Sequence, residues 1–193
     1  MKIDWPKKSG VRSLGKYPYK AVKRTHRRHA PPHRIEHIQF SLIQWDGRLG
    51  TRKEHFGEGR GQVYPIIGKQ PLPSCQEVEV AKTLRRVRNQ AFWVSAFNTS
   101  SMPPRWQPWV ISMSELPPWL EKFDAKIRGR ITSRNGGMPD VVAWDDYNPL
   151  DSALFVECKG PKKTFGQNQE DWLWAAFAEG LKKSQVAVSV RPF

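Results

Sequence analysis

The sequence has few cysteines and no long apolar segment. Cys75 and Cys158 are its only cysteines among 193 residues, too few for the disulfide framework of a small secreted domain. No apolar run approaches the roughly 18 residues that a membrane-spanning helix needs. The opening residues MKIDWPKKSG lack the apolar stretch of a signal peptide. We therefore expect a cytoplasmic protein that is not secreted and has no membrane partner.

Acidic residues are scarce as well. The chain has 18 Asp and Glu against 32 Lys and Arg, a formal net charge of +14. Residues 1–34 alone carry 11 Lys or Arg and one acid, which is +10 of that total. Such a charge suits a polyanion, and nucleic acid is the first candidate. We expect this arm to be weakly structured and to lie on a phosphate backbone, with Arg24, Arg27 and Arg28 among its contacts. A solvated, solubilising tail is the alternative.

The rest of the chain has the composition of a folded domain, with 38% hydrophobic residues. We predict a basic extension over residues 1–70 and a domain over residues 71–193. Ser74 and Glu77 form a capping box at the start of a helix predicted over 73–90. Strands are predicted at 35–45, 91–97, 139–144, 153–159 and 185–191, and a second helix at 167–182. The proline-rich residues 98–130 are predicted to be a loop-like insertion with a short helix at 115–126. The order of elements indicates a mixed α/β fold.

Two adjacent strands carry charged residues at their ends. Asp140 precedes the apolar run VVAW, and Glu157 and Lys159 close the next run, LFVECK. The turn-rich DDYNPLD between the runs predicts a hairpin, which brings Asp140 beside Glu157. Glu157 and Lys159 are two residues apart and share a face of their strand. Two facing carboxylates repel each other unless a cation lies between them, and oxygen ligands suit Mg²⁺ or Mn²⁺. An ordinary hairpin with charged ends is the alternative.

The same residues belong to a longer pattern. Gly137-x-Pro139-Asp140, Glu157-x-Lys159-Gly160-Pro161 and Gln169-x-x-Trp172 follow one another in the order that is found in a known nuclease family. The pattern resembles the VRR-Nuc branch of the PD-(D/E)xK nucleases. The helix sequence GQNQEDWLWAAFAEG and the final run QVAVSV extend the resemblance, which covers roughly residues 74–191. Residues 1–70 lie outside it, and 98–135 is longer than the corresponding family segment.

The resemblance implies a restriction-endonuclease-like core with a central mixed sheet flanked by helices. It implies that Asp140, Glu157 and the backbone carbonyl of Cys158 hold Mg²⁺, that Lys159 is catalytic and that Gln169 supports the site. The family also has an acid near the start of its first helix. Glu77 is the best match, as a catalytic residue and metal ligand, although capping alone accounts for it equally well. Cys158 itself points away from Glu157 and is expected to be a small residue of the core.

Further basic residues lie near these motifs. We expect contacts with DNA from residues flanking the predicted site: Arg128, Arg130, Arg134, Lys162 and Lys163. A solvated charged surface is the equal alternative for them.

Three classes of function remain open at this point. The first is a Mg²⁺-dependent DNA endonuclease that cuts junctions or flaps in repair, recombination or phage replication. For this class, the resemblance implies that the enzyme is a homodimer and that its products carry 5′-phosphates. The second is a restriction-type enzyme that reads a duplex sequence. The third is a nucleic-acid-binding protein without catalysis, for which acids facing phosphates would serve no purpose. RNA as the substrate is not distinguished from DNA by these side chains.

Overall fold

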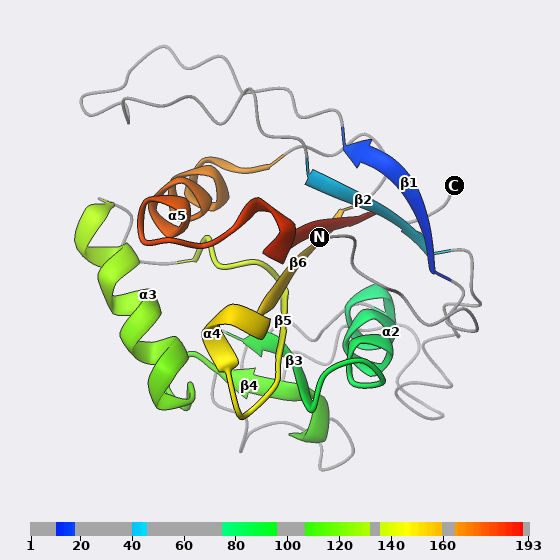
Figure 1. Cartoon of the computed structure of the whole chain (residues 1–193), viewed down its shortest axis with the longest axis horizontal. Helices are drawn as coiled ribbons and strands as arrows, with labels where there is room; N and C mark the ends of the chain where they lie inside the picture. Colours follow the sequence, from blue (N-terminus) through cyan, green and yellow to red (C-terminus); the bar gives the residue numbers. More distant parts are fainter. Residues whose placement is uncertain are drawn as a thin grey trace, which may run out of the picture.

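The structure is a computed structural model, and it describes residues 11–17, 40–45, 75–95, 107–131, 136–159 and 165–190. A seven-stranded mixed sheet forms its centre, in the order β1-β2-β7-β6-β5-β3-β4 (Figure 1). The strands are β1 (Val11–Tyr17), β2 (Phe40–Trp45), β3 (Gln90–Ser95), β4 (Val110–Ser112), β5 (Val141–Trp144), β6 (Leu154–Lys159) and β7 (Val186–Val190). The helices are α2 (Cys75–Leu84), α3 (Pro118–Arg130), α4 (Pro149–Ser152) and α5 (Gln167–Ala178), with short 3₁₀ turns η3 (Gln107–Trp109) and η4 (Lys183–Gln185). The predicted α/β class is confirmed.

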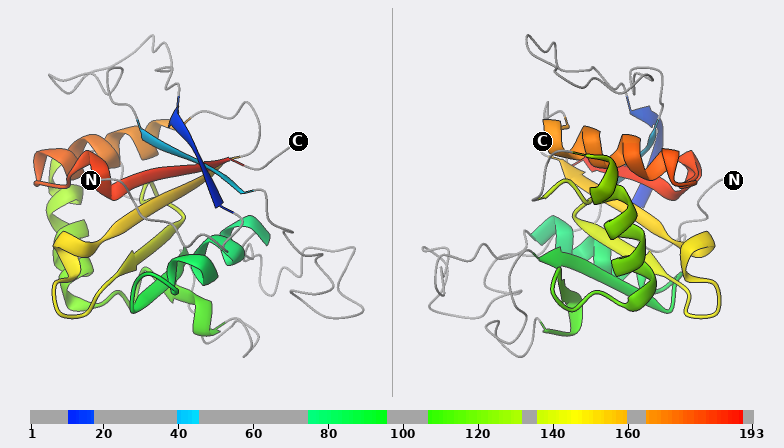
Figure 2. Two further views of the ribbon diagram at one scale, coloured as in Figure 1. Left: turned by 45° about the vertical axis from the view of Figure 1, so that its right-hand side comes forward. Right: turned by 90° about the vertical axis from the view of Figure 1, so that its left-hand side faces the viewer.

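Helices cover both faces of the sheet (Figure 2). Alternate residues of each central strand separate into two apolar clusters because side chains alternate across a strand. Val142 and Phe155 pack with α3 and α5 on one face, whereas Val141 and Val156 pack with α2 on the other. The central strands β5 and β6 are therefore buried on both sides, and their ends lie in a region of low water access.

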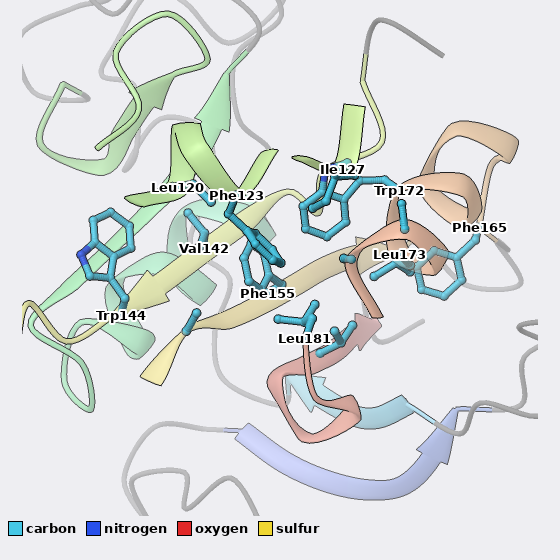
Figure 3. Packing of buried hydrophobic residues seen from close by; sticks show 14 of the residues in the cluster. Leu120, Phe123, Ile127, Val142, Trp144, Phe155, Phe165, Trp172, Leu173 and Leu181 are labelled. Atoms are coloured by element: carbon cyan, nitrogen blue, oxygen red, sulfur yellow. The ribbon is translucent and has the colours of Figure 1, made fainter. Parts of the chain in front are cut away.

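Helix α3 forms much of the larger cluster. Pro118 occupies its first turn, where a missing N–H is tolerated. Leu120, Phe123 and Ile127 recur at helical spacing and are buried against β6 and α5 (Figure 3). Burial of each such side chain contributes about 1.5–3 kcal/mol. The short helix expected at 115–126 is thus present, although it begins at Pro118 and extends to Arg130.

The first predicted helix ends earlier than its apolar stripe suggested. Helix α2 stops at Leu84, and the chain turns to run back as β3. The Asn89 N–H donates to Asp145 Oδ1 at 2.9 Å, and the Arg85 guanidinium stacks between the rings of Phe92 and Trp109. These contacts, formed with distant segments, override the helical pattern that continues through Val87.

The N-terminal segment contributes a strand that the sequence did not predict. Strand β1 pairs antiparallel with β2, and β2 pairs parallel with β7. A bulge between Ser13 and Gly15 shifts the register of β1. A bulge interrupts the alternation by which a strand is recognised, which explains why β1 escaped prediction.

The C-terminal elements agree with expectation apart from one helix end. Helix α5 stops at Ala178, four residues before the predicted end. Gly180 follows with φ 97°, a left-handed conformation suited to glycine, and the Leu181 N–H donates to the Ala176 carbonyl. In the described part of the chain, no helix combines the length and apolarity that crossing a membrane requires.

Candidate active site

Asp140 and Glu157 are neighbours, as the predicted hairpin requires. Strands β5 and β6 pair antiparallel with Val141 opposite Val156, which places Asp140 opposite Glu157. The Cys158 N–H donates to Asp140 Oδ2 at 2.8 Å, and the Val94 N–H donates to the Asp140 carbonyl at 2.8 Å. Strands on both sides therefore fix the aspartate. The connection is not a simple turn, because it contains α4.

The two carboxyl groups are poorly hydrated and close together. Glu157 is 2% exposed, and its carboxyl lies within hydrogen-bonding range of that of Asp140. Burial raises the pKa of Glu157 to about 8, and the charge of Asp140 adds to the effect. Burial likewise raises the pKa of Asp140, although the Cys158 N–H opposes this. A hydrogen bond between the two groups requires a proton on one of them, so the pair retains a proton near neutral pH.

One oxygen of the Glu157 carboxylate tests whether the pair fits a cation. Glu157 Oε1 accepts from Lys159 Nζ at 2.8 Å and from Gln169 Nε2. Glu157 Oε2 is buried and accepts no hydrogen bond from a donor among the described residues. In the metal-free pair, the proton shared with Asp140 offsets part of the cost of this burial, and a divalent cation would take the place of that proton. Asp140 and Glu157 thus fit a hard cation such as Mg²⁺.

Lys159 is held by neighbours on three sides. Its Nζ donates to Gln169 Oε1 at 2.7 Å, contacts Glu157 Oε1, and lies 5.3 Å from the centroid of the Phe165 ring. Phe165 is itself almost fully buried. The sequence motifs predicted a role for Gln169 but none for Phe165. The aromatic residue directly before the Gly166 that caps α5 was the available signal.

The first turn of α5 brings Gln169 to the two charged residues. Gln169 Oε1 also accepts from the Gly166 N–H at 2.9 Å, so the side chain closes back over the start of its own helix. Gly137 lies against this turn with φ 97°, and a Cβ at that position would come within 2.3 Å of the Asn168 carbonyl oxygen. Gly137 is therefore required for close packing of that segment on α5.

Cys158 and Glu77 lie toward the other face of the sheet. Cys158 packs with the α2 cluster, as predicted. Burial raises the pKa of its thiol, with further contributions from the charges of Asp140 and Glu77, so it is unsuited to act as a nucleophile. Glu77 lies near enough to affect this thiol. Within the described residues, however, no three His, Cys, Asp or Glu side chains lie close enough to share a metal ion. The assignment of Glu77 as a ligand stays a prediction.

The predicted DNA-binding residues are only partly visible. Arg128 donates to Asp124 and to the Gly136 carbonyl, and Arg130 pairs with Glu179. Both side chains are thus engaged within the molecule, and their contact with DNA stays a prediction. The others lie outside the described residues: Arg24, Arg27, Arg28, Arg134, Lys162 and Lys163.

Comparison with family models connects this geometry to known enzymes. The model of the VRR-NUC domain matches residues 112–190, the segment that runs from the end of β4 to the end of β7. Residues 112–190 form a VRR-NUC domain. This domain belongs to the PD-(D/E)xK-like nucleases, so the chain carries a nuclease domain with a restriction-endonuclease-like fold. No curated protein and no solved structure matches the chain.

The limits of the VRR-NUC domain separate the predicted site residues into two groups. Asp140, Glu157, Lys159 and Gln169 lie inside the matched segment, and so does α3. Glu77 and the strands β1, β2 and β3 lie outside it. The matched segment therefore includes α3, whereas α2 and the strands β1, β2 and β3 lie outside it.

Proposed function

We propose that the chain is a divalent-metal-dependent DNA endonuclease that recognises a branched or flapped structure. The observation that supports this most is the pairing of the half-buried Asp140 with the buried Glu157, whose Oε2 accepts no hydrogen bond from the described residues, beside the firmly held Lys159. Asp140, Glu157 and the Cys158 carbonyl would hold Mg²⁺, or Mn²⁺ in its place. When bound, the ion supplies Lewis-acid chemistry, which withdraws charge from phosphate oxygens and acidifies water.

The chain's own groups supply the remaining chemistry. The Lys159 ammonium lies at the rim of the carboxylate pair, where it stabilises negative charge that develops on a phosphate or orients the attacking water. Gln169 holds Lys159 and Glu157 together through the two ends of one amide. This support fixes both groups before substrate arrives, and preorganisation of this kind is a large part of electrostatic catalysis.

The choice of DNA and the manner of its recognition rest on charge and on the family. The N-terminal arm, with Arg24, Arg27 and Arg28, would follow the phosphate backbone. A homodimer would present two active sites to two strands. A restriction-type enzyme that reads a sequence is the main alternative within the same chemistry.

Cleavage of a substrate panel tests the proposal. Labelled duplex, single strand, 5′ flap and four-way junction DNA are incubated with Mg²⁺, Mn²⁺ or EDTA. Asp140→Asn preserves the shape of the side chain but removes its charge, and we expect cleavage to fall by at least about 10²-fold. Asp146→Asn makes the same change at an exposed residue of the β5–β6 connection and serves as the matched control.

The panel has decisive outcomes. Branched DNA cut preferentially, with loss in EDTA and in Asp140→Asn but not in Asp146→Asn, supports the proposal. Cleavage that persists in EDTA contradicts metal dependence, and binding of every substrate without cutting favours the non-catalytic binder. Cutting of duplex at defined positions favours the restriction-type enzyme. Sedimentation velocity of the same preparation tests the dimer, which a monomeric mass would exclude.

A further inference from the structure

Hydrogen bonds from two α3 side chains connect α5 with the segment that leads to Asp140. Asp124 is 7% exposed, and its Oδ1 accepts from Trp172 Nε1 of α5 at 2.7 Å. Its other oxygen, Oδ2, accepts from Arg128 Nε at 3.1 Å, one helical turn later. Arg128 Nη1 then donates to the Gly136 carbonyl at 2.6 Å. One carboxylate and one guanidinium thus tie together α5, α3 and the glycine turn.

The glycine turn is confined from two sides. Arg128 holds the Gly136 carbonyl from α3, and Gly137 packs against the Asn168 carbonyl in the first turn of α5. Both glycines have positive φ values, 74° and 97°. Asp140 follows three residues after Gly137, and Gln169 directly follows Asn168. The position of the turn therefore sets the distance between Asp140 and the residues supported by α5.

The guanidinium group of Arg128 already has a carboxylate partner within the protein. Its side chain is 19% exposed, and the Asp124 carboxylate neutralises it. Arg130, two residues later, is 46% exposed and pairs with Glu179 away from the glycine turn. A planar guanidinium can donate to a carboxylate and a carbonyl at once, which an ammonium group cannot reproduce with the same geometry.

We propose that Asp124 and Arg128 are positioning residues that clamp the Gly136–Gly137 turn and so hold Asp140 beside Glu157. This inference rests on the proposed function, because it states how Asp140 and Glu157 are kept in the arrangement that would bind the metal ion. It replaces the DNA contact expected for Arg128 with an internal role. Loss of an outer partner of this kind lowers metal affinity by about 10–100-fold in metalloproteins.

Three variants distinguish the positioning role of Arg128 from a direct contact with DNA phosphate. Arg128→Met removes the donors and retains the length of the side chain. Arg128→Lys retains the charge but not the planar fork. Arg130→Met is the matched control on the same helix. Each purified full-length protein is measured for Mn²⁺ binding without DNA, for DNA binding in EDTA, and for kcat and KM of cleavage.

The clamp also has a reporter that requires neither metal nor DNA. The Cys158 N–H donates to Asp140 Oδ2, so its hydrogen exchange in the metal-free protein reports whether Asp140 stays in place. We expect both Arg128 variants to exchange this amide at least about fivefold faster. The Val156 amide in the same strand and the thermal midpoint show whether the fold is intact.

The expected pattern is specific to Arg128. In both Arg128 variants Mn²⁺ affinity should fall about tenfold and kcat should fall with it, whereas DNA affinity in EDTA and KM stay within about twofold. Arg130→Met should match the unsubstituted protein in Mn²⁺ affinity, in Cys158 exchange and in thermal midpoint, which are the assays that do not involve DNA. If Arg128→Met fails to fold, Arg128→Lys, which keeps an ion pair with Asp124, provides the same test.

Other results would overturn the clamp. Weaker DNA binding in Arg128→Met that Arg128→Lys restores, with normal Mn²⁺ affinity, would make Arg128 a phosphate contact. Equal effects of Arg128→Met and Arg130→Met would indicate general damage to α3. Should the unsubstituted protein bind no Mn²⁺ and cut no DNA, the proposed function fails. Cys158 exchange then still decides the clamp, because an unchanged rate in Arg128→Met excludes it.

Discussion

Lys159 illustrates how a buried charge can be kept ready for chemistry. The side chain is only 9% exposed, and burial of an unpaired ammonium group would cost several kcal/mol. Glu157 and Gln169 each accept a short hydrogen bond from it, and the Phe165 ring lies beside it. These partners compensate the loss of water and remove rotational freedom. The ammonium group therefore has one position, at the rim of the carboxylate pair.

Replacement of Lys159 should separate catalysis from binding. Lys159→Met keeps the length of the side chain and removes its charge, and we expect cleavage to fall by at least about 10²-fold. Affinity for DNA in EDTA should change by less than about twofold, because one enclosed charge contributes little to phosphate binding. Fluorescence anisotropy gives the affinity and single-turnover cleavage gives the rate. Lys183→Met on the exposed η4 turn is the control, and a normal cleavage rate in Lys159→Met would remove Lys159 from the catalytic groups.

At the scale of elements, the sequence predicted best where its signals are local. Asp140, Glu157 and Lys159 lie at the ends of short apolar runs, and pairing of consecutive strands brings them together. The end of α2, by contrast, depends on Asp145, 56 residues from its partner Asn89. A short helix was expected at 115–126, and α3 ends four residues later, at Arg130. The Asp124–Trp172 bond joins residues 48 positions apart, and no local pattern indicates it.

The pairing of β1 indicates which basic residue of this strand would lie nearest to Lys159 in the proposed contact between the arm and DNA. Arg12 pairs with Gln44, Gln44 with Val190, and Val190 with Lys159. Register partners share one row across a sheet, so this row ends at Lys159. Lys16 pairs with Ser41, and Ser41 pairs with Ala187, which packs on the opposite, α2 face. The register shift in β1 thus puts Arg12 and Lys16 in different kinds of row, one leading to Lys159 and the other to Ala187.

This difference predicts an asymmetric dependence on salt. Arg12→Ala should weaken duplex binding and lower the slope of log affinity against log salt by about one unit, as expected for one lost phosphate contact. Lys16→Ala removes the same charge from the same strand and should leave the slope unchanged. Titrations at several salt concentrations, in EDTA, measure both slopes. Equal slopes for the two variants would show that the arm acts only through its total charge.

At the scale of the whole molecule, the site lies where the sheet is most enclosed. Helices α3 and α5 on one face and α2 on the other leave the ends of β5 and β6 with little water. The same enclosure that strengthens electrostatic interactions in catalysis raises the pKa values of both carboxyl groups. The metal-free protein therefore holds a proton that its unfolded chain releases, and folding stability becomes linked to pH.

The linkage has a definite sign. The pKa of Glu157 is about 8 in the folded chain and close to its ordinary value of 4.5 when unfolded, so between these values the folded state binds more protons. The free energy of unfolding of the metal-free protein should consequently fall as pH rises through this window, by up to about 1.4 kcal/mol per pH unit. Urea unfolding in EDTA, followed by circular dichroism, measures this slope. Glu157→Gln cannot ionise and should flatten it, whereas saturating Mg²⁺, which we propose to bind the ionised pair, should stabilise the protein most at the alkaline end. A metal-free protein whose stability rises from about pH 5 to about pH 8, and rises equally in Glu157→Gln, would contradict a protonated carboxyl pair.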